Sequence, residues 1–183
     1  MGLRFVLITL TYKLKPNYMK KIYLLALAVI GFSANSFAQS TTTASTTATI
    51  ITPISVSKTN DMNFGLIATN GLAGTASLDY ANAVTGGGGV SVVTGGIPKT
   101  AQFAVIGETN NTFSISVPTG SITLTGTTAG VTVSNFVADL GPTGTLASGT
   151  KSFFVKAILN VPASVVAGSY FNTAGLSVTV NYN

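Results

Sequence analysis

The sequence predicts an all-β domain, built from many short strands as an antiparallel sandwich or barrel. Apolar and polar residues alternate with a period of two, and the alternating positions are rich in β-branched and aromatic side chains. Clusters of Gly, Asn and Pro recur roughly every ten residues between these runs, a spacing that is typical of such folds. No stretch after Thr47 keeps a helical period, and the best candidate, residues 162–166, is one turn at most.

The alternation places the strands in order along the chain. We expect a first strand from Ala48 to Val56 and a last one from Leu176 to Tyr182, with others at 62–66, 113–117, 122–124, 131–133 and 151–161. The inward positions should form the core, namely Phe64, Phe113, Phe153, Val155, Val178 and Val180. The run Gly86–Gly89 predicts a flexible hairpin or a bulge, because glycine accepts backbone conformations that other residues avoid.

All of the net charge lies before residue 39. The formal charge is +5, and the unbalanced cations are Arg4, Lys13, Lys15, Lys20 and Lys21. Met19-Lys20-Lys21, the apolar run Ile22–Phe32 and the small-x-small site Ser36-Phe37-Ala38 follow in the order of a secretory signal peptide. We therefore expect export, with cleavage after Ala38. The apolar run of about eleven residues is short for the roughly twenty that span a bilayer, so a membrane anchor is the weaker interpretation.

Composition divides the chain into three segments. Residues 1–38 are an N-terminal extension plus signal peptide, in which Met19 is the expected true start; the alternative is a long n-region that is removed with the rest. Residues 39–47 are expected to be a flexible Ser/Thr-rich arm, and residues 48–183 a single domain. The segment after Ala38 balances its lysines and acids, so the basic pI of 9.6 does not indicate nucleic-acid binding.

The residues that enzymes use most often are missing from the composition. The chain has no His and no Cys, which removes the commonest proton carrier and the thiol nucleophile. The four lysines after residue 39 are expected to be solvated charges near strand ends and turns, namely Lys58, Lys99, Lys151 and Lys156. The four acids are widely separated in sequence, so no carboxylate pair is indicated. We expect no enzymatic activity and no catalytic residues.

Metal and cofactor sites are not expected either. Zinc sites need Cys or His ligands, which the chain lacks. The segment Asn60-Asp61-Met62-Asn63 offers several oxygen atoms, but a turn with an Asx hydrogen bond explains it better than a calcium loop. The glycines of Gly86–Gly89 lack the Lys-Ser/Thr that completes a phosphate-binding loop.

Three motifs occur in a characteristic order. The domain opens with a Thr/Ile-rich strand followed by Asp61-Met62-Asn63-Phe64-Gly65, continues with Phe103-Ala104-Val105-Ile106-Gly107 and closes with the alternating segment Ser177–Asn183. Over residues 48–183 this order resembles a secreted bacterial family known as domain of unknown function 4402. The resemblance implies an immunoglobulin-like, pilin-like antiparallel β-sandwich, and it implies architecture more than function.

A more distant likeness is to spore coat protein U-type and fimbrial pilin-like domains. Those domains also combine an early Phe-Gly strand with a C-terminal strand that has a penultimate aromatic residue, here Tyr182. Pilins of the chaperone–usher type usually carry a disulfide, whereas this chain has no Cys.

Three functions remain open from the sequence. The first is a non-catalytic structural or adhesive protein of the periplasm, cell surface or extracellular space. Its terminal strands could associate with another copy or with another surface subunit by strand addition. The second is a soluble secreted binding module for carbohydrate or protein, for which Tyr80, Tyr170 and Phe171 are the candidate exposed aromatics. A secreted hydrolase ranks last, because His, Cys and close acids are lacking.

Overall fold

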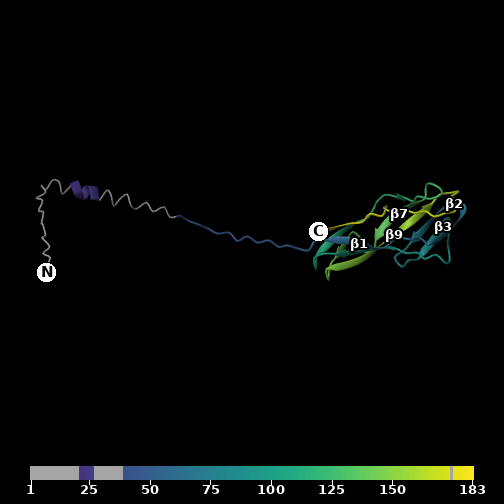
Figure 1. Ribbon diagram of the computed structural model, residues 1–183, viewed down its shortest axis with the longest axis horizontal. Coiled ribbons are helices and arrows are strands. Elements are labelled where there is room, and N and C mark those ends of the chain that lie inside the picture. Colours follow the sequence, from purple (N-terminus) through teal and green to yellow (C-terminus); the bar gives the residue numbers. More distant parts are fainter. Residues whose placement is uncertain (1–20, 27–38, 174) are drawn as a thin grey trace, which may run out of the picture. The chain divides into compact units, whose positions relative to one another are not determined.

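The computed structural model describes residues 21–26, 39–173 and 175–183 (Figure 1). Residues 21–26 are helical, residues 39–54 form neither helix nor strand, and Thr49–Asn183 belong to one compact unit. The predicted start at Met19 and the predicted cleavage site after Ala38 involve residues outside the described ranges. Within those ranges, no helix is long and apolar enough to cross a membrane.

The compact unit is mostly β, and its strands form two antiparallel sheets. The three-stranded sheet has the order β10-β5-β8, with β5 at Thr112–Ser116, β8 at Thr143–Thr145 and β10 at Thr179–Tyr182. The seven-stranded sheet has the order β1-β4-β9-β2-β3, with β7 paired to β9 and β6 paired to β7. Its strands are β1 Ser55–Asn60, β2 Leu66–Leu78, β3 Val84–Val93, β4 Ala101–Ile106, β6 Ile122–Thr123, β7 Thr132–Ala138 and β9 Thr150–Val161.

Strand β9 is the centre of the larger sheet, and its alternation was predicted correctly. Its inward positions Phe153, Val155, Ala157, Leu159 and Val161 are all buried. Strand β7 pairs with one side of β9. The other side of β9 is shared by two strands: β4 pairs with its first half, as far as Ala101 opposite Val155, and β2 pairs with its second half, which begins with Leu78 opposite Ala157. Only the second half of β2, Gly74–Leu78, therefore reaches the central strand.

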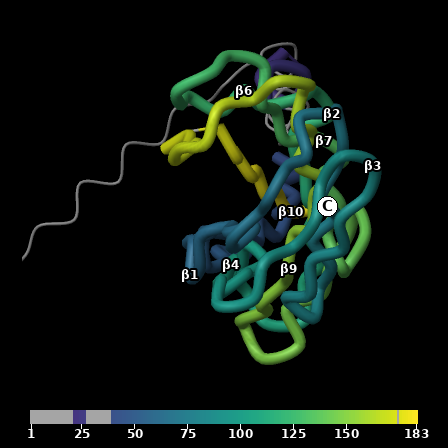
Figure 2. The backbone as a smooth tube through the Cα atoms, turned by 90° about the vertical axis from the view of Figure 1, so that its right-hand side faces the viewer, coloured from purple at the N-terminus to yellow at the C-terminus, as the bar shows by residue number. Residues whose placement is uncertain are grey.

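Two segments far apart in the sequence form one long antiparallel ladder at the margin of this sheet (Figure 2). Residues 55–60 of β1 pair with β4, Asn63 bridges Lys99, and residues 66–69 of β2 pair with β3. The register shifts within β1, between Lys58 and Asn60, and again between the Asn63 bridge and β2, but the pairing resumes after each shift. Residues 55–69 thus run continuously along residues 90–106.

Both sheets contribute to a single core. Phe113, Ile115 and Val180 come from the three-stranded sheet, and they join the buried residues of β4, β7 and β9 in one cluster. The rings of Phe103 and Phe153 stack within it, with centroids 5.5 Å apart. Of the six predicted core residues, Phe113, Phe153, Val155 and Val180 are buried, as expected. Phe64 and Val178 are only half-buried, because they pack against the cluster from segments outside the strands.

The two terminal strands are shorter than the sequence predicts. Strand β1 begins at Ser55 and not at Ala48, because residues 48–54 have no neighbouring strand among the described residues. Strand β10 covers Thr179–Tyr182, and the predicted positions Leu176 and Val178 precede it. In both cases the apolar alternation continues beyond the hydrogen-bonded ladder.

The prediction of a flexible hairpin or a bulge at Gly86–Gly89 needs correction, because these glycines belong to strand β3 and the bulge beside them lies in β2. Thr69 pairs with Val90 and Gly74 pairs with Gly88, so residues 70–73 bulge opposite Gly89. Gly89 is buried there, and a Cβ atom at this position would collide with the carbonyl oxygen of Leu72. Gly88 has a φ of 66°, which favours glycine for conformational reasons.

Candidate functional site

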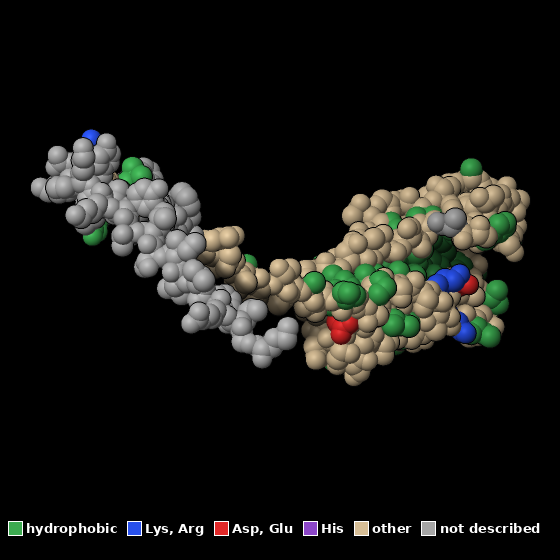
Figure 3. All heavy atoms as spheres, turned by 60° about the vertical axis from the view of Figure 1, so that its left-hand side comes forward, with side chains coloured by type: hydrophobic (Ala, Val, Ile, Leu, Met, Phe, Trp, Pro, Cys, Tyr) green, Lys and Arg blue, Asp and Glu red, His purple; other side chains and the backbone are tan. Residues whose placement is uncertain are grey.

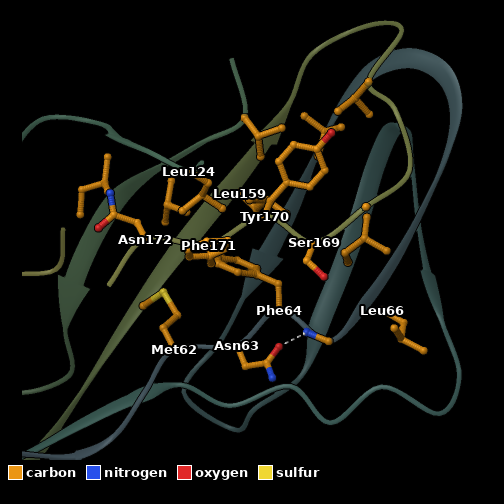
Figure 4. A pocket seen from close by; sticks show the side chains of 18 of the residues that line it. Met62, Asn63, Phe64, Leu66, Leu124, Leu159, Ser169, Tyr170, Phe171 and Asn172 are labelled. Atoms are coloured by element: carbon orange, nitrogen blue, oxygen red, sulfur yellow. Dashed lines mark hydrogen bonds between the residues drawn. The ribbon is translucent and has the colours of Figure 1, made fainter. Parts of the chain in front are cut away.

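The described part of the domain contains a cavity of about 840 Å³ (Figure 4). One wall is formed by residues 61–69, and the opposite wall is formed by residues 165–172 together with Leu176. The floor consists of buried core residues of β7 and β9, including Val133, Phe136 and Leu159. Phe64 and Phe171 lie close to each other inside it in the close-up view. The lining is therefore largely apolar.

A second cavity of about 370 Å³ continues the first. It shares Asp61, Met62, Asn172 and Leu176 with the larger cavity and extends to Lys58 and Ala101. We call the two cavities together the groove, which runs between residues 58–69 on one side and residues 165–173 with Gly175 and Leu176 on the other. The space-filling view shows a hollow with hydrophobic side chains inside it (Figure 3).

The charges in the groove cancel each other. Lys58 and Asp61 are the only charged residues among those that line it in the described chain, and they form an ion pair with 2.5 Å between Nζ and Oδ1. Both side chains are largely exposed, so the pair adds little to stability. Its main consequence is that the groove presents no net charge to an occupant.

The first wall is shaped by a turn at Asn63. Its backbone bonds to Lys99 in both directions at 2.8 Å, and its side-chain Oδ1 accepts a hydrogen bond from the Gly65 N–H at 2.8 Å. The predicted Asx hydrogen bond in the segment Asn60–Asn63 is thus confirmed. Gly65 has a φ of 74° and packs against Pro98, which fixes the turn where Phe64 enters the groove.

The second wall is tied to residues 123–128. The Tyr170 hydroxyl donates to the Val166 carbonyl at 2.6 Å and accepts from the Thr128 N–H at 3.2 Å. Phe171 and Thr125 exchange two backbone hydrogen bonds, and the Asn172 side chain donates to the Thr123 carbonyl at 2.9 Å. These hydrogen bonds hold residues 166–172 in place, although this segment forms only an isolated β-bridge, between Phe171 and Thr125. The Phe171 side chain is left 59% exposed.

One wall of the groove is a strand edge without a partner strand in the described chain. Among the described residues, residues 55–69 pair only with residues 90–106, because β9 reaches β2 no earlier than Gly74. Strand β10, which does not line the groove, pairs only with β5 among them. In the described part of the chain, β1 and β10 approach each other without a hydrogen-bonded ladder between them. Such edges expose rows of backbone donors and acceptors that can pair with another strand.

The segment that precedes β1 is fixed to the domain at one residue. The Thr52 N–H donates to Glu108 Oε2 at 2.9 Å, and the Thr52 carbonyl accepts from the Tyr182 hydroxyl at 2.6 Å. The bond from Thr52 lowers the pKa of the Glu108 carboxyl. Before this residue, Ile50 is 96% exposed and Ile51 is 44% exposed. Within the described part of the domain, the backbone of residues 49–51 has no hydrogen-bond partner.

The structure brings together two of the three candidate aromatics. Tyr170 and Phe171 both line the groove. Tyr80 lies elsewhere and is half-buried, with its hydroxyl donating to the Val137 carbonyl at 3.2 Å and with Lys156 Nζ 4.9 Å from the ring centroid. Burial, followed by the charge of Asp139, raises the pKa of Tyr80. Met62 and Phe64 belong to the groove as well, although their alternation indicated only a core strand.

The acidic residues have structural partners. Asp79 Oδ1 accepts from the N–H groups of Ala81 and Ala83 at 2.8 Å, which closes the turn between β2 and β3. Asp139 Oδ1 accepts from the Phe154 N–H at 2.9 Å. Among the described residues, no three acids gather in a cluster that could hold a metal ion.

The fold and the groove define a class, a two-sheet antiparallel β domain with an open apolar groove. Residues 54–182 match the domain of unknown function family DUF4402, and the chain belongs to this family. The resemblance seen in the three motifs is thereby confirmed. Comparisons with curated proteins and with solved structures gave no match.

Proposed function

We propose that this protein is a non-catalytic structural or adhesive subunit that is exported to the periplasm, cell surface or extracellular space, and that its copies associate by strand addition. The observation that carries the proposal is the apolar stretch just before Thr52. Ile50 is almost completely exposed, and the backbone of residues 49–51 has no partner among the described residues. An extended segment with exposed apolar side chains gains both hydrogen bonds and burial when it joins a sheet edge.

The proposed architecture is an immunoglobulin-like, pilin-like sandwich. Its support is the single core to which both sheets contribute, with Phe113 and Val180 from one sheet and Phe153 and Val155 from the other. A sandwich of two aligned antiparallel sheets has this arrangement of inner faces.

The absence of catalysis is supported by composition and by the acids. The sequence contains no His and no Cys. Asp79 and Asp139 accept backbone hydrogen bonds, and Asp61 pairs with Lys58, so these three carboxylates have structural roles. Export is supported by the order of charged, apolar and small residues between Met19 and Ala38.

A second candidate is a secreted binding module, which is favoured by the aromatic residues of the groove. Tyr170 and Phe171 line it, and Phe171 is 59% exposed. A cavity of about 840 Å³ lies within the size range of small-molecule sites. In this case the groove would accept an uncharged ligand that is partly apolar.

Light scattering on the exported, purified chain over a range of concentrations tests the proposal. We expect oligomers or polymers whose mass rises with concentration. A monomer at every concentration would contradict self-association and would favour the binding module.

A further inference from the structure

We propose that the groove receives residues 40–51 of a second copy as an added β-strand. This inference rests on the proposed self-association and specifies both partners of the contact. It follows from three features: the unpaired edge beside the groove, the composition of residues 40–51, and the end of the domain at which that segment leaves it.

The acceptor is the outer edge of residues 55–69. This edge is continuous over β1, the Asn63 bridge and the first residues of β2, and the described residues provide no strand on its outer side. Side chains of the same segment, among them Met62, Phe64 and Ile67, line the groove. An added strand would therefore hydrogen-bond to this edge and place alternate side chains over an apolar floor.

The donor has the matching chemistry. Residues 40–51 contain no charged side chain, and the charges that line the groove are paired with each other. In an extended strand, Ala44, Thr46, Ala48 and Ile50 share one face. The largest of them, Ile50, is 96% exposed in its own chain. These side chains are small enough to enter a groove that already has Phe64 and Phe171 inside it.

The position of Thr52 sets the direction in which the segment of a second copy would run along the groove. Thr52 is held at the end of the ladder where Ser55 pairs with Ile106, whereas the larger cavity lies near the other end, where Thr69 pairs with Val90. We consider a donor segment that leaves its own domain at the Ser55 end of this edge and enters the groove of the next domain at the Thr69 end. Such a segment runs parallel to residues 55–69 of the domain that receives it. The copies then join head to tail, which produces an open chain or, if the rotation between copies closes, a ring.

Cross-linking between single-cysteine variants tests this arrangement, since the natural chain has no Cys. The donor variant is Ile50→Cys. The acceptor variant is Ser169→Cys in the second wall, and its matched control is Ser148→Cys, the same substitution at an exposed position outside the groove. Each pair is mixed in the full exported chain and oxidised with oxidised glutathione.

Docking raises the local concentration of the thiols, so Ile50→Cys with Ser169→Cys should form about tenfold more heterodimer than Ile50→Cys with Ser148→Cys. A synthetic peptide of residues 40–51 should suppress that excess, and a scrambled peptide should not. Circular dichroism of each variant confirms that it is folded.

Equal yields from the two pairs, or an excess that the peptide does not reduce, would overturn the inference. Light scattering of the natural chain separates this failure from the failure of the proposed function. If the chain associates while the yields are equal, self-association stands and the groove is not its site. If the chain is monomeric and the yields are equal, the proposed self-association and the proposed role of the groove are both wrong.

Discussion

The hydroxyl of Tyr182 donates a hydrogen bond of 2.6 Å to the carbonyl oxygen of Thr52, 130 positions earlier in the chain. The same hydroxyl accepts from the Glu108 N–H at 2.6 Å, and the Glu108 carboxylate accepts from the Thr52 N–H. The penultimate residue thus fixes the point at which the N-terminal segment leaves the domain. We call this set of three bonds the Thr52 clamp.

Replacing Tyr182 by Phe should weaken the Thr52 clamp. The Phe ring keeps the packing but removes two hydrogen bonds and leaves the Glu108 N–H without its protein partner, so we expect a loss of about 1–2 kcal/mol. Urea unfolding measures the change. Tyr80→Phe is the control, because the Tyr80 hydroxyl makes a single bond of 3.2 Å. A loss for Tyr182→Phe no larger than that of the control would contradict the clamp.

The bond between Glu108 and Thr52 should depend on pH. The backbone hydrogen bond from Thr52 is the largest cause of the lowered pKa of Glu108, whose ordinary value is 4.5. A lowered folded-state pKa means that the bond stabilises the protein above the ordinary value and loses this effect as the pH falls through the lowered value.

Nuclear magnetic resonance can follow the Thr52 amide during an acid titration. We expect its chemical shift to titrate below pH 4.5 and to be flat in Glu108→Gln, which keeps an acceptor oxygen but not the charge. A titration that persists in Glu108→Gln would show that another group is responsible.

Truncating Phe153 should strongly destabilise the domain. This side chain is completely buried and stacks on Phe103, so Phe153→Ala should cost about 3–5 kcal/mol in unfolding free energy. Phe171→Ala removes the same atoms from a side chain that is 59% exposed and should cost much less. Chemical denaturation compares the two, and similar losses would contradict the assignment of the core.

Adding a methyl group at Gly89 should disturb the bulge of β2. The new Cβ would collide with the Leu72 carbonyl and would approach Asn70 Oδ1 to 2.6 Å, so we expect Gly89→Ala to cost about 1–3 kcal/mol. Gly120→Ala is the control, because no atom lies within 4 Å of its Cβ position. Thermal unfolding distinguishes them, and an unchanged melting temperature for Gly89→Ala would contradict the close approach.

Local pattern was sufficient to predict the central strand and most of the core. The alternation in β9 is uninterrupted, and Phe153 and Val155 are buried where it placed them. The alternation gave a wrong start for the first strand. Alternation indicates which side chains a segment could bury, but it does not indicate whether a neighbouring strand is present to pair with that segment. Residues 48–54 have the pattern without the neighbouring strand.

The groove could not be predicted from the sequence for a related reason. It depends on which strand edges stay unpaired, and this is decided by pairings between distant segments, such as residues 55–69 with residues 90–106. The sequence predicts Tyr170 and Phe171 as candidate exposed aromatics, but only the fold shows that they lie opposite Phe64.

Copies of this chain should associate through the N-terminal segment around Ile50, and the variant Ile50→Asp measures whether they do. Ile50 is 96% exposed, so the substitution should leave the fold of its own domain unchanged. Burying an unpaired carboxylate in a contact is costly, so light scattering should show that the variant no longer associates. Ser148→Asp adds the same charge outside the groove and should associate like the natural chain. Association of Ile50→Asp at the level of the natural chain would contradict the claim.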